Sequence, residues 1–262
     1  MKVTVVIPAR YASTRLPGKP LLKHTGWPLI RHVYEQSKKS KKATSVVIAT
    51  DDERIVNVIK DFGGTYIMTD PNHPTGTDRL AEVASKLSGV DLIINVQGDE
   101  PEIEPENIDH LIALFSTANA EMGTLVAPFP KENIDGTGSP LDHACVKAVL
   151  GAPIKDPNTN AMLGYQVLYF SRSPIPYPRD ASGKITDPSC YYMHLGIYAY
   201  RPEFLKQYVA LPQGRLELSE KLEQLRVLEN GYKIVAGIVP KATPGIDTPA
   251  DYEAFVKRWK TK

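Results

Sequence analysis

The stretch VVIPARYASTRLPGKPL, residues Val5–Leu21, decides how the chain folds. It begins as an apolar, β-branched run, which favours a buried strand. After Pro8 the run becomes a loop that carries three cations, Arg10, Arg15 and Lys19. An apolar first strand is typical of a parallel sheet that helices cover on both faces. The cationic loop should then emerge at the carboxyl end of the strand, where such sheets bind ligands.

Strands and helices alternate through the first half of the chain. Apolar runs predict strands at Val3–Ile7, Ser45–Thr50, Thr65–Thr69 and Leu92–Val96. Apolar residues at helical spacing predict helices that include Leu29–Tyr34, Ile55–Phe62, Leu80–Leu87 and Ile108–Phe115. Alternation with short connections indicates crossover units. We therefore expect an α/β fold built on a doubly wound, mostly parallel sheet.

The pattern changes after about residue 124. Strand-like runs without intervening helices follow, at Leu125–Pro128, Ala144–Leu150, Gln166–Phe170 and Leu195–Tyr200. They predict a smaller mixed-sheet lobe inserted in the C-terminal half. We expect one α/β domain over residues 1–262, with a core at 1–124, the lobe at about 125–215, and a return to the core at 216–262.

Several local signals refine this expectation. Gly151–Gly164, rich in Pro, Asn and Gly, predicts an exposed hairpin. Leucines spaced from Leu218 to Leu228 predict one amphipathic helix that ends at Asn230 and Gly231. Lys233–Val239 predicts a last strand, and the pair Thr248–Pro249 predicts the start of a terminal helix.

Composition excludes several classes of protein. The chain has 262 residues and a formal net charge of +1, so it lacks a global basic field for nucleic acid. No run approaches the roughly 20 apolar residues of a membrane span. Cys145 and Cys190 lack the spacing of a metal or redox site, and no targeting segment is visible. We therefore expect reduced thiols and a cytoplasmic protein.

The first loop predicts a polyphosphate site. It is neither a P-loop nor a dinucleotide fingerprint, because both glycine patterns are absent. Small residues let backbone N–H groups approach a phosphate, and the two kinds of cation bind phosphate, Arg bidentately and Lys as a point charge. The small residues are Ala12, Ser13 and Thr14. The alternative is a solvated basic loop without a ligand.

Asp99 predicts a metal ligand at the same rim. Gly98 gives a tight exit from an apolar strand, so Asp99 should face the cationic loop. Mg²⁺ in proteins uses one or two carboxylates together with substrate phosphates. Asp247, which follows another strand and loop, is the second candidate ligand. The alternatives for Asp99 are helix capping or an ion pair with Arg10.

The sequence resembles the CMP-Kdo synthetases, the 3-deoxy-manno-octulosonate (Kdo) cytidylyltransferases. The resemblance runs in order along nearly the whole chain. Its blocks are IPARYASTRLPGKPL, VIATDDERI, PTGTDRLAEV, INVQGDEP, YFSR, HLGIYAYR, LEQLRVLENGYKI and PGIDTPADYE. Each block alone is modest, but the combination is specific. It implies the fold of the nucleotide-diphospho-sugar transferases.

The resemblance also implies roles for individual residues. Lys19, Arg10 and Asp99 would be catalytic. The CTP phosphates would be bound by Arg10 and Lys19 with help from Arg15, and the cytidine by Ala9, Thr75, Gly76 and Gln97. Asp99 and Asp247 would hold Mg²⁺. The sugar acid would be bound by His194, Tyr198, Glu217 and Gln224, and Arg79 would lie beside the nucleotide region.

The implied reaction joins Kdo and CTP into CMP-Kdo and pyrophosphate, for lipopolysaccharide biosynthesis, in a homodimer. A related acid sugar, 8-amino-Kdo or sialic acid, is an alternative acceptor, and a nucleotide-binding protein without turnover is an alternative of another class. Two features depart from the family pattern: Asp78 stands where Glu is common, and Gly151–Gly164 is longer than the expected hairpin. No residue stands out as a general base.

Overall fold

The computed structural model describes residues 1–12 and 15–261, whose contacts form two compact units. Unit 1 comprises Met1–Asp109, Tyr200–Val209 and Thr243–Lys262, and unit 2 comprises His110–Ala199 and Ala210–Ala242. The three sequence segments expected above, with bounds at residues 124 and 215, stay a prediction.

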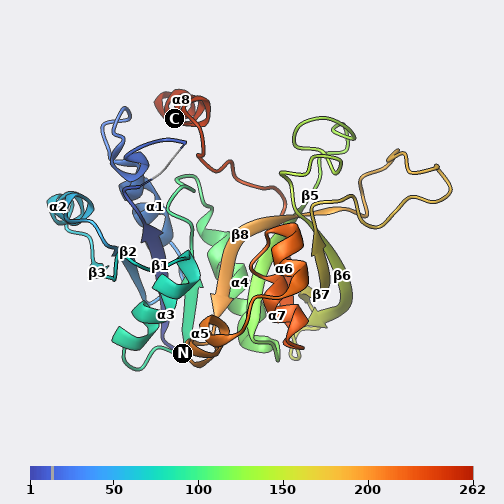
Figure 1. Cartoon of the computed structure of the whole chain (residues 1–262), viewed down its shortest axis with the longest axis horizontal. Coiled ribbons are helices and arrows are strands. Elements are labelled where there is room, and N and C mark those ends of the chain that lie inside the picture. Colours follow the sequence, from blue (N-terminus) through green and yellow to red (C-terminus); the bar gives the residue numbers. More distant parts are fainter. Residues whose placement is uncertain (13–14, 262) are drawn as a thin grey trace. The chain divides into compact units, whose positions relative to one another are not determined.

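Unit 1 contains four strands that pair with one another in parallel. These strands are β1 (Val3–Ala9), β2 (Ser45–Thr50), β3 (Tyr66–Met68) and β4 (Leu92–Asn95), of which Figure 1 labels β1, β2 and β3. They lie in the order β3-β2-β1-β4, and both neighbours of β1 run parallel to it. Side chains at the centre of β1 are fully buried on both faces, as the apolar run predicts. The predicted α/β class is therefore confirmed.

Helices of unit 1 alternate with these strands. They are the short 3₁₀ helix η1 (Lys19–Leu21), α1 (Leu29–Lys38), α2 (Glu53–Asp61), α3 (Gly76–Lys86) and α8 (Pro249–Lys260). Two more helices, α4 (Pro105–Thr117) and α5 (Pro202–Ala210), have residues in both units. Thr248 caps α8 through a bond to the Asp251 N–H, which confirms the predicted helix start. An apolar cluster joins α1 and α8 around Leu29, Tyr252 and Phe255.

Unit 2 combines parallel and antiparallel pairs. Its strands are β5 (Met122–Pro128), β6 (Lys147–Lys155), β7 (Met162–Ser171), β8 (Tyr192–Tyr200) and β9 (Ile234–Ile238). β5 pairs with β9 in parallel, whereas β7 runs antiparallel to both β9 and β6. β6 also pairs with β8. The predicted hairpin at Gly151–Gly164 is confirmed, since β6 and β7 join there across a short turn.

The single helix predicted from Leu218 to Leu228 is wrong. The structure has two short helices instead, α6 (Arg215–Glu220) and α7 (Leu225–Glu229). The break lies at Lys221, whose φ of 54° is in the left-handed region. The carboxylate of Glu220 accepts from Ser171 Oγ and the Arg172 N–H, so tertiary bonds replace the continuation of the helix. The helical spacing of the leucines continues across Lys221, so the sequence pattern gives no sign of the break.

Two expectations from composition can be compared with the structure. Cys145 and Cys190 are both free thiols, as expected from their spacing. Among the described helices, none has the length and apolar content needed to cross a membrane.

Candidate active site

Lys19 brings together three segments of unit 1 that are far apart in the sequence. Its Nζ donates to Asp99 Oδ2 at 2.8 Å and to the Ile246 carbonyl at 2.7 Å, and it lies 3.5 Å from Asp247 Oδ1. The Ile246 N–H donates to the Asp99 carbonyl at 2.9 Å, which fixes the two acidic segments side by side. Only 15% of the Lys19 side chain is exposed, so its charge acts in a partly dehydrated place. The predicted cation and both predicted metal ligands thus meet at one point.

Two glycines explain how the chain reaches this arrangement. Gly18 precedes η1 with a φ of 65°, a conformation that L side chains rarely adopt, and so turns Lys19 toward the acids. A Cβ on Gly98 would lie 2.6 Å from the Pro8 carbonyl oxygen. The exits of β1 and β4 can therefore approach one another only because residue 98 has no side chain.

Asp99 and Asp247 suit a divalent cation in their donor type. Their carboxylates already converge on one positive group, the Lys19 ammonium. Within the part of the chain that the structure describes, no three His, Cys, Asp or Glu side chains form a metal-binding group. Two carboxylates suffice for Mg²⁺ when a bound phosphate supplies further oxygens. The residues therefore fit a cation shared with a substrate phosphate, and the metal assignment stays a prediction.

Glu100 is a half-buried acid beside Asp99 that sequence reasoning did not place in the site. Burial raises its pKa to about 8, and the Asp99 charge contributes in the same direction. Glu100 is therefore mostly protonated at pH 7. In the sequence, the only sign that Asp99 affects the pKa of Glu100 is that the two acids are adjacent in GDEP.

Arg10 connects the end of β1 to the segment that precedes α3. Its Nη2 donates to the His73 carbonyl at 2.8 Å and to the Thr75 carbonyl at 3.0 Å. These bonds use two of the five N–H donors of the guanidinium. A phosphate can therefore be bound by the others while the segment stays held. The alternative expectation of an Arg10–Asp99 pair is not what the structure shows, because Asp99 pairs with Lys19.

Thr75 and Gly76 begin helix α3. The Thr75 hydroxyl accepts from the N–H groups of Thr77 and Asp78, and the Asp78 carboxylate accepts from the Thr75 N–H at 3.1 Å. This reciprocal capping box fixes the helix start. Asp78 therefore completes the motif despite being one methylene shorter than Glu. Ala9, which ends β1, is buried, and Gln97 lies just beyond β4.

Arg15 is the most exposed of the three loop cations. It forms an ion pair with Asp247 at 3.0 Å, but two thirds of its side chain is exposed. A pair so open to water contributes little to stability. The neighbouring Ser13 and Thr14, predicted to approach phosphate, lie outside the described residues.

His194, in unit 2, is held by β-strand neighbours. Its Nε2 lies 3.1 Å from the Thr124 hydroxyl, and its ring meets the edge of Phe170 and lies near Tyr198. The Thr124 hydroxyl also bonds to the Ile197 carbonyl at 2.8 Å and to the Leu195 carbonyl at 3.2 Å, which favours the tautomer in which His194 donates from Nε2. Burial lowers the pKa of His194 to about 3. A neutral His194 can position a ligand but is unsuited to proton donation near pH 7.

Glu217 and Gln224 are both buried in unit 2. The Glu217 carboxylate accepts two bonds from the Arg226 guanidinium, at 2.7 and 2.5 Å. Each carboxylate oxygen can accept more than one bond, so the predicted contact of Glu217 with the sugar acid stays a prediction. Gln224 differs, since among the described residues its buried Nε2 has no hydrogen-bond partner. An orphaned donor of that kind suits a hydroxyl or carboxylate of a ligand.

Arg79 is fully buried and pairs with Asp51 at 2.6 Å, close to the segment that Arg10 holds. The position of Arg79 beside the nucleotide region, which the family resemblance implies, stays a prediction, and the GTDR motif does not reveal its partner.

In unit 2 the buried Lys147 donates to the carbonyls of Asp142 and Cys145. Sequence reasoning missed Lys147, because a single Lys within a strand pattern predicts only a surface position.

Comparison with known proteins gives matches over nearly the whole chain. The family model described as "Cytidylyltransferase" matches residues 4–234. A 3-deoxy-manno-octulosonate cytidylyltransferase of Parabacteroides distasonis is 49% identical over 255 residues, which cover 97% of this chain and 96% of that protein. The protein of the same name from Thermodesulfovibrio yellowstonii is 47% identical over 265 residues, which cover 98% of each chain.

Solved structures agree with these matches. The structure of CMP:2-keto-3-deoxy-manno-octonic acid synthetase complexed with CTP is 38% identical, with a TM-score of 0.84, and the match covers 100% of this chain and 99% of that chain. A cytidylyltransferase from Leptospira borgpetersenii is 18% identical with a TM-score of 0.61, covering 100% and 88% of the two chains, and shares the fold alone.

Proposed function

The chain belongs to the cytidylyltransferase family, and from this premise we propose that it transfers the cytidylyl group of CTP to Kdo, forming CMP-Kdo and pyrophosphate. The observation that carries the choice of acceptor is the near-full-length identity to relatives named for that substrate. The meeting of Lys19, Asp99 and Asp247 supports the chemistry.

The proposed step is a displacement at phosphorus. The anomeric hydroxyl oxygen at C2 of Kdo bonds to the α-phosphorus of CTP, the bond from that phosphorus to the pyrophosphate oxygen breaks, and the hydroxyl proton is released to water. Catalysis of such a step depends on positioning and on charge stabilisation. Lys19 and Arg10 would neutralise the departing pyrophosphate. Arg10 would do so while its Nη2 still holds the segment before α3.

We propose Mg²⁺ as the cofactor, held by Asp99 and Asp247. When bound, the ion would neutralise phosphate charge and lower the pKa of the attacking hydroxyl. Lys19 lies between the two carboxylates that would hold the ion. Its ammonium would then leave the carboxylates and pair with the phosphates of CTP.

In unit 2 we propose that Kdo is bound by His194, Tyr198 and Gln224. Neutral His194 would accept from a sugar hydroxyl at Nδ1 in the tautomer that donates from Nε2 to Thr124. The orphaned Gln224 amide would donate to the sugar acid. Glu217 would act through Arg226 unless the ion pair opens.

The finer assignments are also proposals. We infer a cytoplasmic homodimer whose product is used for lipopolysaccharide biosynthesis. 8-Amino-Kdo is the nearest alternative acceptor and sialic acid a more distant one. A nucleotide-binding protein without turnover is disfavoured, because Lys19, Asp99 and Asp247 are all present and meet.

The experiment that tests the proposed function measures pyrophosphate release from CTP with Kdo and Mg²⁺, with CMP-Kdo identified by mass spectrometry. The wild-type chain should release one pyrophosphate for each CMP-Kdo formed, and a chelator should stop the reaction. Asp99→Asn should fold but show no turnover. Normal activity of Asp99→Asn would contradict the metal assignment, and absence of CMP-Kdo from the wild-type reaction would contradict the function.

A further inference from the structure

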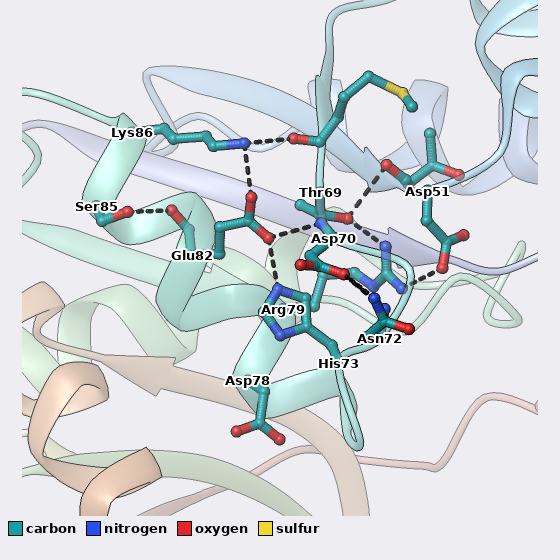
Figure 2. Close-up of polar contacts among 12 residues, drawn as sticks. Asp51, Thr69, Asp70, Asn72, His73, Asp78, Arg79, Glu82, Ser85 and Lys86 are labelled. Carbon is teal, nitrogen blue, oxygen red and sulfur yellow. Dashed lines mark hydrogen bonds and ion pairs between the residues drawn. The ribbon is translucent and has the colours of Figure 1, made fainter.

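Glu82, on α3, holds the segment that leads into that helix, residues 70–75, called here the base loop (Figure 2). Its Oε2 accepts from the Asp70 N–H at 2.9 Å and from His73 Nε2 at 2.5 Å. Since a carboxylate can only accept, His73 must hold its ring proton on Nε2. One carboxylate thus binds both the backbone and a side chain of the base loop.

The same face of α3 fixes the approach to the base loop. Lys86 donates to Glu82 Oε1 at 2.6 Å and to the Met68 carbonyl at 2.7 Å. Arg79 donates to the Thr69 hydroxyl as well as to Asp51. Residues 79, 82 and 86 follow the i, i+3, i+7 spacing of one helix face. Figure 2 shows these side chains directed toward the segment after β3.

Arg10 holds the opposite end of the base loop. It donates to the carbonyls of His73 and Thr75, and Thr75 in turn caps α3. Glu82 and Arg10 therefore bind different atoms of the same short segment. Burial opposes ionisation of Glu82, but bonds from Lys86, the Asp70 N–H and His73 outweigh it and lower its pKa to about 2. The carboxylate consequently stays ionised across the working pH range.

We propose that Glu82 is a positioning residue for nucleotide binding, which fixes the base loop so that Thr75 and Gly76 meet the cytidine of CTP. This inference rests on the proposed function, because CTP is the ligand that the loop would bind. A loop that is already ordered loses less conformational freedom when its ligand binds. Glu82 should therefore strengthen CTP binding without touching the nucleotide.

The test compares Glu82→Ala with the wild-type chain by calorimetric CTP binding, steady-state kinetics and hydrogen exchange of the ligand-free protein. We expect the Kd and KM for CTP to rise about tenfold, the cost of ordering a loosened loop. Amides of residues 70–75 should exchange faster, while kcat and the KM for Kdo change less than about threefold. Glu82→Gln, which keeps one acceptor oxygen, should fall between the two.

Glu35→Ala is the matched control, because Glu35 pairs with Arg31 and Lys38 on its own helix α1. It should leave CTP binding unchanged. If Glu82→Ala does not fold, His73→Ala removes one bond to Glu82 and should weaken CTP binding in the same direction. An unchanged Kd for CTP, or a parallel loss of kcat and of both substrate affinities, would overturn the positioning role. A wild-type chain that binds CTP but makes no CMP-Kdo would contradict the proposed function alone, since CTP binding and hydrogen exchange would still test Glu82.

Discussion

Lys19 is the residue on which the proposed chemistry depends most. A cation held between Asp99 and Asp247 is stabilised by both, yet it remains within reach of any phosphate that a bound metal draws to the same carboxylates. Its presence in the motif was readable from the sequence, as was the acid at residue 99. The Ile246 carbonyl, its third partner, was not readable, because backbone acceptors carry no residue-type signal.

Replacement of Lys19 by alanine should lower kcat/KM for CTP by roughly 30- to 1000-fold, which corresponds to about 2–4 kcal/mol of lost transition-state stabilisation. The loss should fall mainly on kcat, because charge on the leaving pyrophosphate grows in the transition state. Steady-state pyrophosphate release gives both constants. Lys23→Ala removes an exposed lysine four residues further on and should have little effect. Equal kcat/KM values for Lys19→Ala and the wild type would contradict the role.

Because of His194, the free energy of unfolding should fall as the pH is lowered. Its pKa is about 3 in the fold against 6.5 in the unfolded chain, so the unfolded state alone binds a proton as the pH falls through 6.5. Stability contributed by neutral His194 is therefore complete above pH 6.5 and is lost toward pH 3. Between pH 8 and 5 the loss amounts to about 2 kcal/mol.

Denaturant unfolding at pH 5, 6, 7 and 8 measures this loss. His194→Gln should remove about 2 kcal/mol of the wild-type pH dependence, whereas His143→Gln, which changes an exposed side chain, should leave the dependence as it is. The same slope in His194→Gln and wild type would show that His194 does not carry it.

At the scale of elements, the strands of unit 1 were predictable because each is an apolar run with a clear exit. Ser45–Thr50 was predicted with both ends correct, and the terminal helix with its cap. Helix α5 was missed, because its apolar residues follow strand β8 so closely that their helical spacing does not stand out from the strand pattern. The break at Lys221 was missed because bonds to Glu220 from Ser171 at the end of β7 and from Arg172, rather than a glycine or proline, impose it.

Gly98→Ala should disturb the site around Lys19 and Asp99, because residue 98 lies at the exit of β4. The added Cβ would lie 2.6 Å from the Pro8 carbonyl, so the exits of β1 and β4 must separate. We expect the free energy of unfolding to fall by about 1–3 kcal/mol, the usual cost of overpacking. Activity should fall more steeply, since Asp99 moves away from Lys19. Thermal unfolding and kcat/KM together measure the two effects.

Gly245→Ala is the control for this substitution, because no atom lies within 4 Å of its added Cβ. It should retain stability near that of the wild type. A Gly98→Ala variant with wild-type stability and activity would show that the close approach of the two strand exits is not required.

For the whole molecule, family membership was readable from the sequence because motif blocks follow one another along nearly all of the chain. The partners of several site residues were not. Arg226 forms an ion pair with Glu217, and Asp51 forms one with Arg79, although the sequence predicted neither pairing. Such pairs depend on which helix faces meet, which residue spacing along one element does not specify.

The choice of acceptor is the central claim, and a panel of acid sugars tests it most directly. Pyrophosphate release from CTP should be measured with Kdo, 8-amino-Kdo and sialic acid at equal Mg²⁺, and kcat/KM compared among the three. We predict the highest kcat/KM with Kdo and little or no release with sialic acid. A higher kcat/KM with either other sugar, or no release with any of them, would contradict the assignment of this chain to Kdo activation.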